Sequence, residues 1–310
     1  MSFTRRAFLQ TTVALPLISL PFMGVAADPI QRAGTARLLT GLAAYSFREY
    51  FVGDLQRPVK MPKTERTMDM FSFIDYCADL GCAGAELTSY FLPKDLSGDV
   101  LQRIRRHAFL RGVAITGTAI ANNFTLPKGE QRDAQLAEVK MWIDQAAKLG
   151  APHIRVFAGA APKDISPDAA RALCIESLQE CCDYAGRYGI ILGLENHGGI
   201  VAEADALLAI VKAVNSPWVG INLDSGNFHT ADPYGDLAKC APYAVNVQIK
   251  VVMKSAGATE SQPTDYQRII TMLRAANYQG FVTLEFEEKE DPYIGVPREF
   301  VRMAAMCQAK

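Results

Sequence analysis

The chain has 310 residues and a formal net charge of −1, from 32 lysines and arginines against 33 aspartates and glutamates. This balance argues against a nucleic-acid-binding protein, since the only basic cluster, residues 103–106, lies on a helical pattern. Seven cysteines, an odd number without a Cys-x-x-Cys pair, argue against a disulfide framework. We expect them to be buried as small apolar side chains, with one bridge at most.

The first 27 residues predict a cleaved export signal. Thr4-Arg-Arg-Ala-Phe-Leu9 places two arginines before an apolar segment, residues 13–23, and small residues follow at 25–27. The segment is too short and too rich in proline to cross a membrane. The motif resembles a twin-arginine (Tat) signal, with an uncleaved anchor as the alternative. It predicts a periplasmic or secreted protein, residues 28–310, with no membrane segment after cleavage.

From residue 38 onward, short apolar runs alternate with longer amphipathic runs. The predicted strands are residues 39–45, 84–87, 113–118, 153–157, 190–194, 219–223, 245–249 and 281–284. The predicted helices are residues 67–80, 96–110, 134–149, 167–188, 203–214, 265–276 and 296–306, with one more turn near 234–239. This alternation is typical of a single-domain (β/α)8 barrel, the TIM barrel. A doubly wound open sheet is disfavoured because no Gly-x-Gly-x-x-Gly follows the first strand.

Polar side chains gather at the predicted carboxyl ends of four successive strands, where a barrel carries its active site. The four oxygen-bearing residues are Glu195, Asp224, Gln248 and Glu285. Converging carboxylates repel one another unless a cation neutralises them. Oxygen ligands suit a hard divalent ion such as Mn2+, Mg2+ or Co2+. Each residue alone would be read as solvated, but the four together favour a metal site.

Four motifs at these strand ends resemble those of a known family. They are Leu-Glu-Asn-His-Gly-Gly, Leu-Asp-Ser-Gly-Asn-Phe, Val-Gln-Ile-Lys and Thr-Leu-Glu-Phe-Glu. The chain resembles the xylose isomerase-like TIM-barrel superfamily, and within it the sugar phosphate isomerase/epimerase family, from about residue 38 to residue 306.

The resemblance implies both a metal site and a reaction. A divalent ion, Mn2+ first, would be held by Glu195, Asp224, Gln248 and Glu285, with Gln248 standing where many relatives have His. The implied enzyme is an isomerase or epimerase of a keto-sugar or related polyol. Glu195 and Glu285 would move a proton through a metal-stabilised enediolate.

Further residues are predicted to contact the substrate, each with an alternative. His197 either binds a substrate hydroxyl or orients Glu195, and Asn227 is a polar substrate contact. Lys250 either neutralises an oxyanion or forms an ion pair with Glu285 or Glu287. Glu86 either serves as an extra acid or substrate ligand or forms an ion pair with Arg155 in the core. His153 is expected to be structural.

Two features of the predicted mouth point to sugar binding. Many aromatic residues follow the strands, and aromatic faces commonly pack on sugar C–H surfaces. The connection over residues 48–63 is the best candidate for a lid. The expected ligand is a small carbohydrate, with a sugar phosphate as the weaker version, and a homo-oligomer is left open.

Three other functions compete with the isomerase. An exported lyase or hydratase acting on 3-keto-glycosides would use the same metal site. A non-catalytic periplasmic carbohydrate-binding protein would explain the Gln248 departure. An endonuclease IV-like enzyme would need many histidines, and the chain has four.

Overall fold

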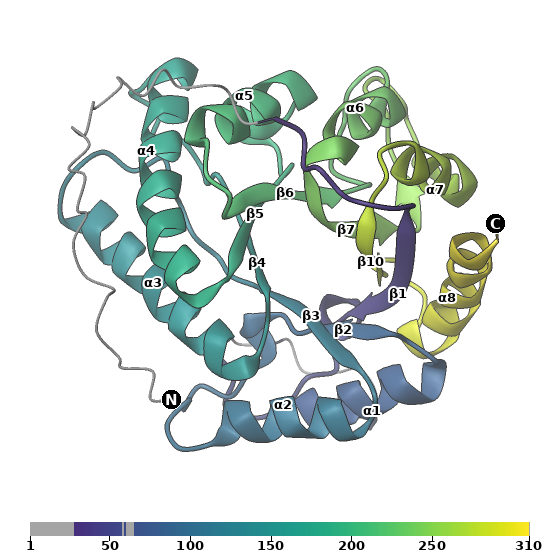
Figure 1. Cartoon of the computed structure of the whole chain (residues 1–310). Coiled ribbons are helices and arrows are strands. Elements are labelled where there is room, and N and C mark those ends of the chain that lie inside the picture. Colours follow the sequence, from purple (N-terminus) through teal and green to yellow (C-terminus); the bar gives the residue numbers. More distant parts are fainter. Residues whose placement is uncertain (1–27, 58, 60–64, 310) are drawn as a thin grey trace, which may run out of the picture.

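Eight parallel strands close into a barrel, in the order β1-β10-β7-β6-β5-β4-β3-β2 (Figure 1). The strands are β1 (Arg37–Ala43), β2 (Gly84–Glu86), β3 (Ala114–Ala119), β4 (His153–Val156), β5 (Ile191–Glu195), β6 (Val219–Asp224), β7 (Ala244–Lys250) and β10 (Gln279–Glu285). Each strand pairs only with its two neighbours in this order, and the pairing of β1 with β10 closes the ring. The prediction of a single TIM-barrel domain is confirmed.

The computed structural model describes residues 28–57, 59 and 65–309. The predicted export signal, residues 1–27, and part of the predicted lid, residues 58 and 60–63, lie outside the described residues. Within the described part of the chain, no helix combines the length and the apolar character that a membrane crossing requires.

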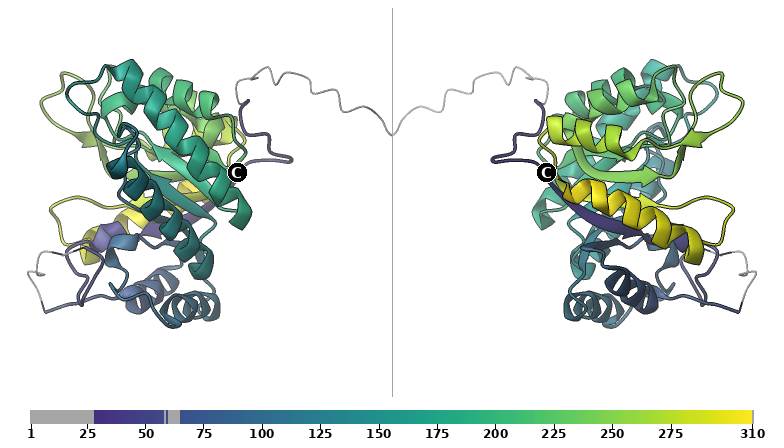
Figure 2. Two further views of the ribbon diagram at one scale, coloured as in Figure 1. Left: turned by 90° about the vertical axis from the view of Figure 1, so that its left-hand side faces the viewer. Right: turned by 90° about the vertical axis from the view of Figure 1, so that its right-hand side faces the viewer.

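Eight α-helices ring the barrel among the described residues. They are α1 (Met70–Leu80), α2 (Val100–Leu110), α3 (Glu130–Leu149), α4 (Pro167–Ala185), α5 (Ala204–Val214), α6 (Pro233–Cys240), α7 (Tyr266–Ala275) and α8 (Pro292–Gln308). Side-chain oxygens cap several N-termini, as Ser166 does for α4 and Asp265 for α7. The helix α6 is longer than the single turn that we expected. Figure 2 shows α8 packed along β1, so the last helix and the first strand lie together.

The hydrophobic core lies between the strands and the helices. Successive residues of a strand point to opposite faces. In β5, Leu192 and Leu194 belong to the apolar core, whereas Gly193 and Glu195 face the barrel interior. Burying each such leucine stabilises the fold by about 1.5–3 kcal/mol. The alternation explains how an apolar strand can still deliver a polar group at its end.

His153 fills a space in the barrel interior that two glycines leave open. A Cβ on Gly117 would lie 2.6 Å from Nδ1 of His153, and a Cβ on Gly193 would lie 2.3 Å from its Nε2. Neither ring nitrogen has a hydrogen-bond partner among the described residues. Burial, followed by the charge of Arg155, lowers the pKa of His153 to about 3. The imidazole is therefore neutral and packs as a structural side chain.

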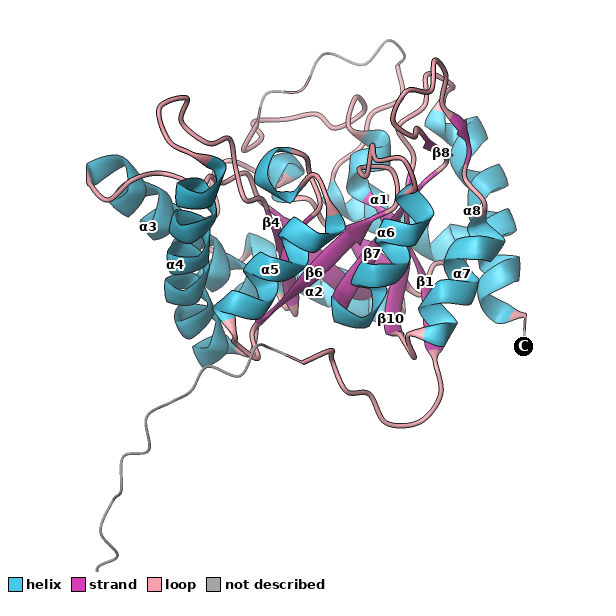
Figure 3. Ribbon diagram, turned by 90° about the horizontal axis from the view of Figure 1, so that it is seen from above, coloured by secondary structure: helices cyan, strands magenta, loops and turns pink. Residues whose placement is uncertain are grey.

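A short two-stranded sheet follows the barrel strand β7. Its strands, β8 (Val252–Met253) and β9 (Gln262–Pro263), pair antiparallel. Figure 3 shows β8 among the long loops at the upper edge of that view. All seven cysteines are free and buried, which confirms the expected packing role.

Candidate active site

A cavity of about 470 Å³ lies at the carboxyl ends of the strands. Five of the predicted site residues line it: Glu195, His197, Asn227, Lys250 and Glu285. The other three, Glu86, Asp224 and Gln248, are buried and do not line it. The structure thus brings the predicted residues together at one end of the barrel, but at two depths.

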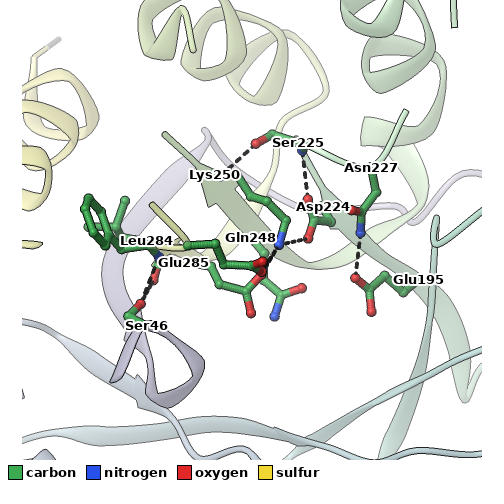
Figure 4. A network of polar contacts seen from close by, with 12 residues as sticks. Ser46, Glu195, Asp224, Ser225, Asn227, Gln248, Lys250, Leu284 and Glu285 are labelled. Atoms are coloured by element: carbon green, nitrogen blue, oxygen red, sulfur yellow. Dashed lines mark hydrogen bonds and ion pairs between the residues drawn. The ribbon is translucent and has the colours of Figure 1, made fainter. Parts of the chain in front are cut away.

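The ammonium group of Lys250 lies among three carboxylates, and Figure 4 shows two of them, Asp224 and Glu285, beside it. Its Nζ is 2.6 Å from Oε2 of Glu285 and 3.1 Å from Oδ2 of Asp224, and it also donates to Oε1 of Glu287. Burial lowers the pKa of Lys250, but the three carboxylates outweigh it and raise the pKa overall. Lys250 is therefore positively charged, and the predicted ion pair with Glu285 and Glu287 is present.

Asp224 is fixed at the end of β6 by contacts to its backbone and its side chain. Its backbone N–H donates to Asn196, whose own amide donates to the Asp224 carbonyl, so this pair ties β5 to β6. The N–H of Gly226 donates to Oδ1 at 2.7 Å. Burial raises the pKa of Asp224 to about 6, although Lys250 opposes the rise. Among the described residues, the other oxygen, Oδ2, has only the Lys250 ammonium as a partner.

Glu195 is held by Arg155 and Asn227. The Nε of Arg155 is 2.9 Å from Oε2 of Glu195, and Nδ2 of Asn227 donates to Oε1 at 2.9 Å. Burial raises the pKa of Glu195 to about 7, and Arg155 opposes this rise. Arg155 also donates to the carbonyl of Ile120 and lies over the ring of Phe157. The predicted pairing of Arg155 with Glu86 is wrong, because Arg155 on β4 reaches toward the end of the adjacent strand β5.

His197 lines the cavity and packs against Phe157, with ring centroids 4.6 Å apart. Asn227 and Arg155 make the contacts that orient the Glu195 carboxylate. Substrate binding by His197 stays a prediction. Among the aromatic residues expected at the mouth, Tyr45, Tyr90 and Phe157 line the cavity. Others pack against one another, including Phe47 and Tyr293.

Beneath the cavity, four polar side chains form a closed hydrogen-bonded ring. Gln248 donates to Oε1 of Glu86 at 2.7 Å, and Asn246 donates to Oε2 at 2.8 Å. Asn222 donates to the Gln248 oxygen at 2.6 Å and accepts from Asn246 at 2.8 Å. Because a carboxylate only accepts, Glu86 turns both amide NH2 groups toward itself. Burial, followed by the charge of Glu285, raises the pKa of Glu86 to about 7.

The residues predicted as metal ligands do not fit a metal ion in this arrangement. Glu195 faces Arg155, Asp224 and Glu285 face Lys250, and the Gln248 oxygen accepts from Asn222. Within the described ranges, no three His, Cys, Asp or Glu side chains are grouped so that they could hold a metal. The positive charge that the carboxylates need comes from two side chains of the protein. The metal ion stays a prediction of the sequence.

The sequence interpretation missed three residues of this network: Arg155 as the partner of Glu195, and Asn222 and Asn246 in the ring. For the two asparagines a signal existed. Asn222 lies two residues before Asp224, and Asn246 lies two before Gln248, so the strand alternation places each pair on one face. Arg155 gave no comparable signal, since its strand could pair its charge with either neighbour.

Comparisons with known proteins were made by sequence and by structure. The sequence comparison supports the predicted family, and the structural comparison supports the fold. A sequence search of curated proteins found no match. Among solved structures, D-psicose 3-epimerase with D-tagatose from Clostridium cellulolyticum H10 has a TM-score of 0.69 and 16% identity, over 87% of this chain and 98% of that chain. The apo form of 3-keto-D-glucoside 4-epimerase from E. coli has a TM-score of 0.63 and 16% identity, over 87% and 99%.

A third solved structure is a probable 3-DHS dehydratase from Bacillus anthracis, with a TM-score of 0.66 and 16% identity, over 86% of this chain and 98% of that chain. At such low sequence identities, these structures support the fold and nothing more specific. The sequence profile of one family matches residues 74–303, most of the barrel. The chain therefore belongs to the xylose isomerase-like TIM barrel family, as the motifs at its strand ends predicted.

Proposed function

We propose that this protein is an isomerase or epimerase that moves a proton next to the carbonyl of a keto-sugar. The observation that carries the proposal is the pair Glu195 and Glu285, two carboxylates that reach one cavity from β5 and β10. Each lies beside a cation of the protein, Arg155 or Lys250. A cavity of about 470 Å³ suits a small ligand. Two solved structures with this fold are sugar epimerases by name, which agrees with the proposal.

The proposed reaction begins with proton removal by Glu195. Its carboxylate takes the proton from the carbon next to the carbonyl. The electron pair of that C–H bond forms a carbon–carbon double bond, and the carbonyl π electrons move to oxygen, giving an enediolate. A fixed positive charge in a buried site stabilises the developing oxyanion.

In the second step a proton returns to carbon. Isomerisation returns it from Glu195 to the neighbouring carbon, while the proton of the adjacent hydroxyl group moves to the oxyanion and leaves a carbonyl group in its place. Epimerisation instead delivers a proton to the other face of the same carbon by way of Glu285, which receives that proton from water. Exchange with water then restores both carboxyl groups. A pKa of about 7 lets Glu195 hold and release a proton near neutral pH.

Proton exchange in D2O tests the proposal. Keto-sugars incubated with the protein should gain deuterium next to the carbonyl, measured by NMR. Glu195→Gln and Glu285→Gln should each slow the exchange by about 100-fold or more. Glu130→Gln, an exposed glutamate on α3, is the control and should leave the rate unchanged. Absence of exchange with every keto-sugar and keto-glycoside would favour carbohydrate binding without catalysis.

A lyase acting on 3-keto-glycosides is the second candidate. It shares the first step, after which the enediolate expels a neighbouring oxygen. The raised pKa of Glu195 favours this step too, because a carboxyl group of pKa about 7 can protonate a leaving oxygen. Product analysis separates the two, since only the lyase breaks a C–O bond.

A further inference from the structure

We propose that the ammonium group of Lys250 takes the place of a divalent metal ion in this site. The carboxylates would then be neutralised by a cation that is part of the chain, and the site would not take up a metal. The catalytic consequence, that Lys250 stabilises the oxyanion, rests on the proposed function, whereas the absence of metal binding is tested separately.

The contacts of Lys250 support this replacement. An ammonium group donates three hydrogen bonds and accepts none. Here Asp224, Glu285 and Glu287 supply three acceptors to one Nζ. Two of the three are residues that the sequence assigns to the metal. Asp224 is fully buried, and its Oδ2 has no other partner among the described residues, so removing the ammonium would leave a buried charge uncompensated.

Gln248 supports the same conclusion from below the cavity. Its oxygen already accepts from Asn222, and its NH2 group donates to Glu86. Its oxygen keeps a second lone pair, but Gln248 does not line the cavity, so to ligate a metal there the amide would have to turn away from Glu86. That turn would deprive a fully buried carboxylate of a donor. The ring therefore holds the fourth expected ligand out of the cavity.

Glu287 gives the substrate a way to reach the ammonium. Its side chain is 35% exposed, compared with 0% for Asp224 and 9% for Glu285. An exposed ion pair contributes little to stability and is the easiest of the three to exchange. We infer that a carbonyl oxygen of the substrate displaces Glu287 from Nζ. The ammonium then faces the oxygen on which the enediolate charge develops, which makes Lys250 a catalytic residue.

Metal binding to the wild type and to a lysine variant tests the replacement. After dialysis against EDTA, the wild type should hold no stoichiometric metal by elemental analysis, and Mn2+, Mg2+ or Co2+ should leave its Tm unchanged. In Lys250→Met the three carboxylates face one another without a cation. Mn2+ at a hundred times its Kd should raise the Tm of this variant by about 5 °C. Lys254→Met is the matched control, because Lys254 also lines the cavity but forms no ion pair among the described residues, and the Tm of this variant should not respond to Mn2+.

Several results would overturn the replacement. One equivalent of bound metal in the wild type would overturn it, whatever the enzymatic activity. A wild-type Tm that rises with Mn2+ would overturn it too. The replacement would also be overturned if the Lys250→Met variant folds and its Tm does not rise with Mn2+. If Lys250→Met does not fold, Lys250→Arg serves in its place. This variant keeps the positive charge, so its Tm should not respond to metal. The metal content of the wild type then decides whether the replacement holds.

Deuterium exchange in the presence of EDTA separates this inference from the proposed function. The wild type should exchange at an undiminished rate, and Lys250→Met in EDTA should lose about 100-fold or more. A wild-type reaction that needs Mn2+ overturns the replacement. A wild type that neither binds metal nor exchanges any keto-sugar overturns the proposed function and leaves the metal result standing.

Discussion

Arg155 places a buried positive charge beside Glu195 and is itself held in several directions. Its guanidinium group donates to the carbonyl of Ile120 at 2.8 Å and lies over the ring of Phe157. Burial lowers the pKa of Arg155, but the Glu195 carboxylate outweighs it and raises the pKa overall. The cation therefore persists at any pH at which the protein is folded. Its charge favours the ionised form of Glu195, the form that can accept a proton.

The activity should depend on pH through Glu195. As a general base it must be ionised, so kcat/KM should fall as the pH drops below about 7, the pKa of this carboxyl in the folded protein. Arg155→Met removes the charge that holds this pKa down and should move the midpoint to higher pH. The rate of deuterium exchange between about pH 5 and 9 measures it.

A suitable control for this profile is Arg187→Met, which removes an exposed arginine that lies over Tyr184. Its midpoint should match that of the wild type. A wild-type profile without an inflection near pH 7 would speak against Glu195 as the base.

At the scale of elements, the polar ring joins strands that are distant in sequence. Glu86 on β2 bonds Asn246 and Gln248 on β7, and Asn222 on β6 completes the circuit. The ring thus crosses the barrel interior between strands that are not neighbours. It fixes the side-chain orientations beneath the cavity and holds Glu86, a fully buried carboxylate that the mechanism does not use.

Asn246→Ala should destabilise the barrel, and more so at high pH. The variant removes the donor to Glu86 and to Asn222, at a cost of about 2–5 kcal/mol. The pKa of Glu86, about 7 when folded against an ordinary 4.5, makes the folded state bind the proton more tightly. The unfolding free energy therefore falls as the pH rises through that range, and the variant should lose most where Glu86 is ionised.

Urea denaturation at about pH 5 and pH 8 measures this difference. Gln267→Ala, an exposed amide on α7, is the control and should change little at either pH. An equal loss at both pH values would mean that the charge of Glu86 is not what Asn246 compensates.

The elements were predictable because each is bounded by local signals, whereas the ring was not. Leu-Gly150 and Tyr-Gly189 end helical patterns before strands, and both glycines adopt the left-handed conformation. In contrast, Asn246 and Glu86 are 160 residues apart, and their contact depends on barrel closure and strand register. Register also explains why β10 begins at Gln279, since it pairs there with Arg37 of β1. The strand-end residues could be found from the sequence, and so could the ion pair of Lys250 with Glu285 and Glu287, but the partners of Glu86 and Glu195 could not.

At the scale of the whole molecule, the chain has nearly equal numbers of basic and acidic side chains, and the lining of the cavity shows the same balance. Four basic and four acidic side chains line it, and they are Arg57, Arg155, Lys250, Lys254, Glu195, Glu285, Glu287 and Glu288. Arg155 and Lys250 are already paired with carboxylates. Such a lining suits a neutral sugar better than a dianionic phosphate ester.

We therefore expect a preference for unphosphorylated substrates. A keto-sugar phosphate should react with a kcat/KM lower by about tenfold or more, which corresponds to about 1.4 kcal/mol of unfavourable charge contact. Competition between a sugar and its phosphate in the exchange assay measures the preference. A phosphate ester that reacts faster would show that Arg57 and Lys254 form an anion site.

The cysteines of the native protein should not react with thiol reagents. All seven are buried, and burial raises the pKa of Cys174 and Cys240 to about 12, so little thiolate exists at neutral pH. Titration with an aromatic disulfide should give close to no reaction in buffer and seven thiols in guanidinium. Fewer than seven thiols on unfolding would reveal a bridge in the purified protein.

The imidazole of His153 has a consequence for how this barrel can change over evolutionary time. Because its ring occupies the space of two missing side chains, we expect positions 117, 153 and 193 to change together. A relative in which Gly117 or Gly193 is replaced should also have a smaller residue in place of His153. The residues at these three positions should therefore covary in an alignment of relatives. A double-mutant cycle reports the same coupling, since Gly193→Ala should be tolerated better beside His153→Ala than beside the native ring.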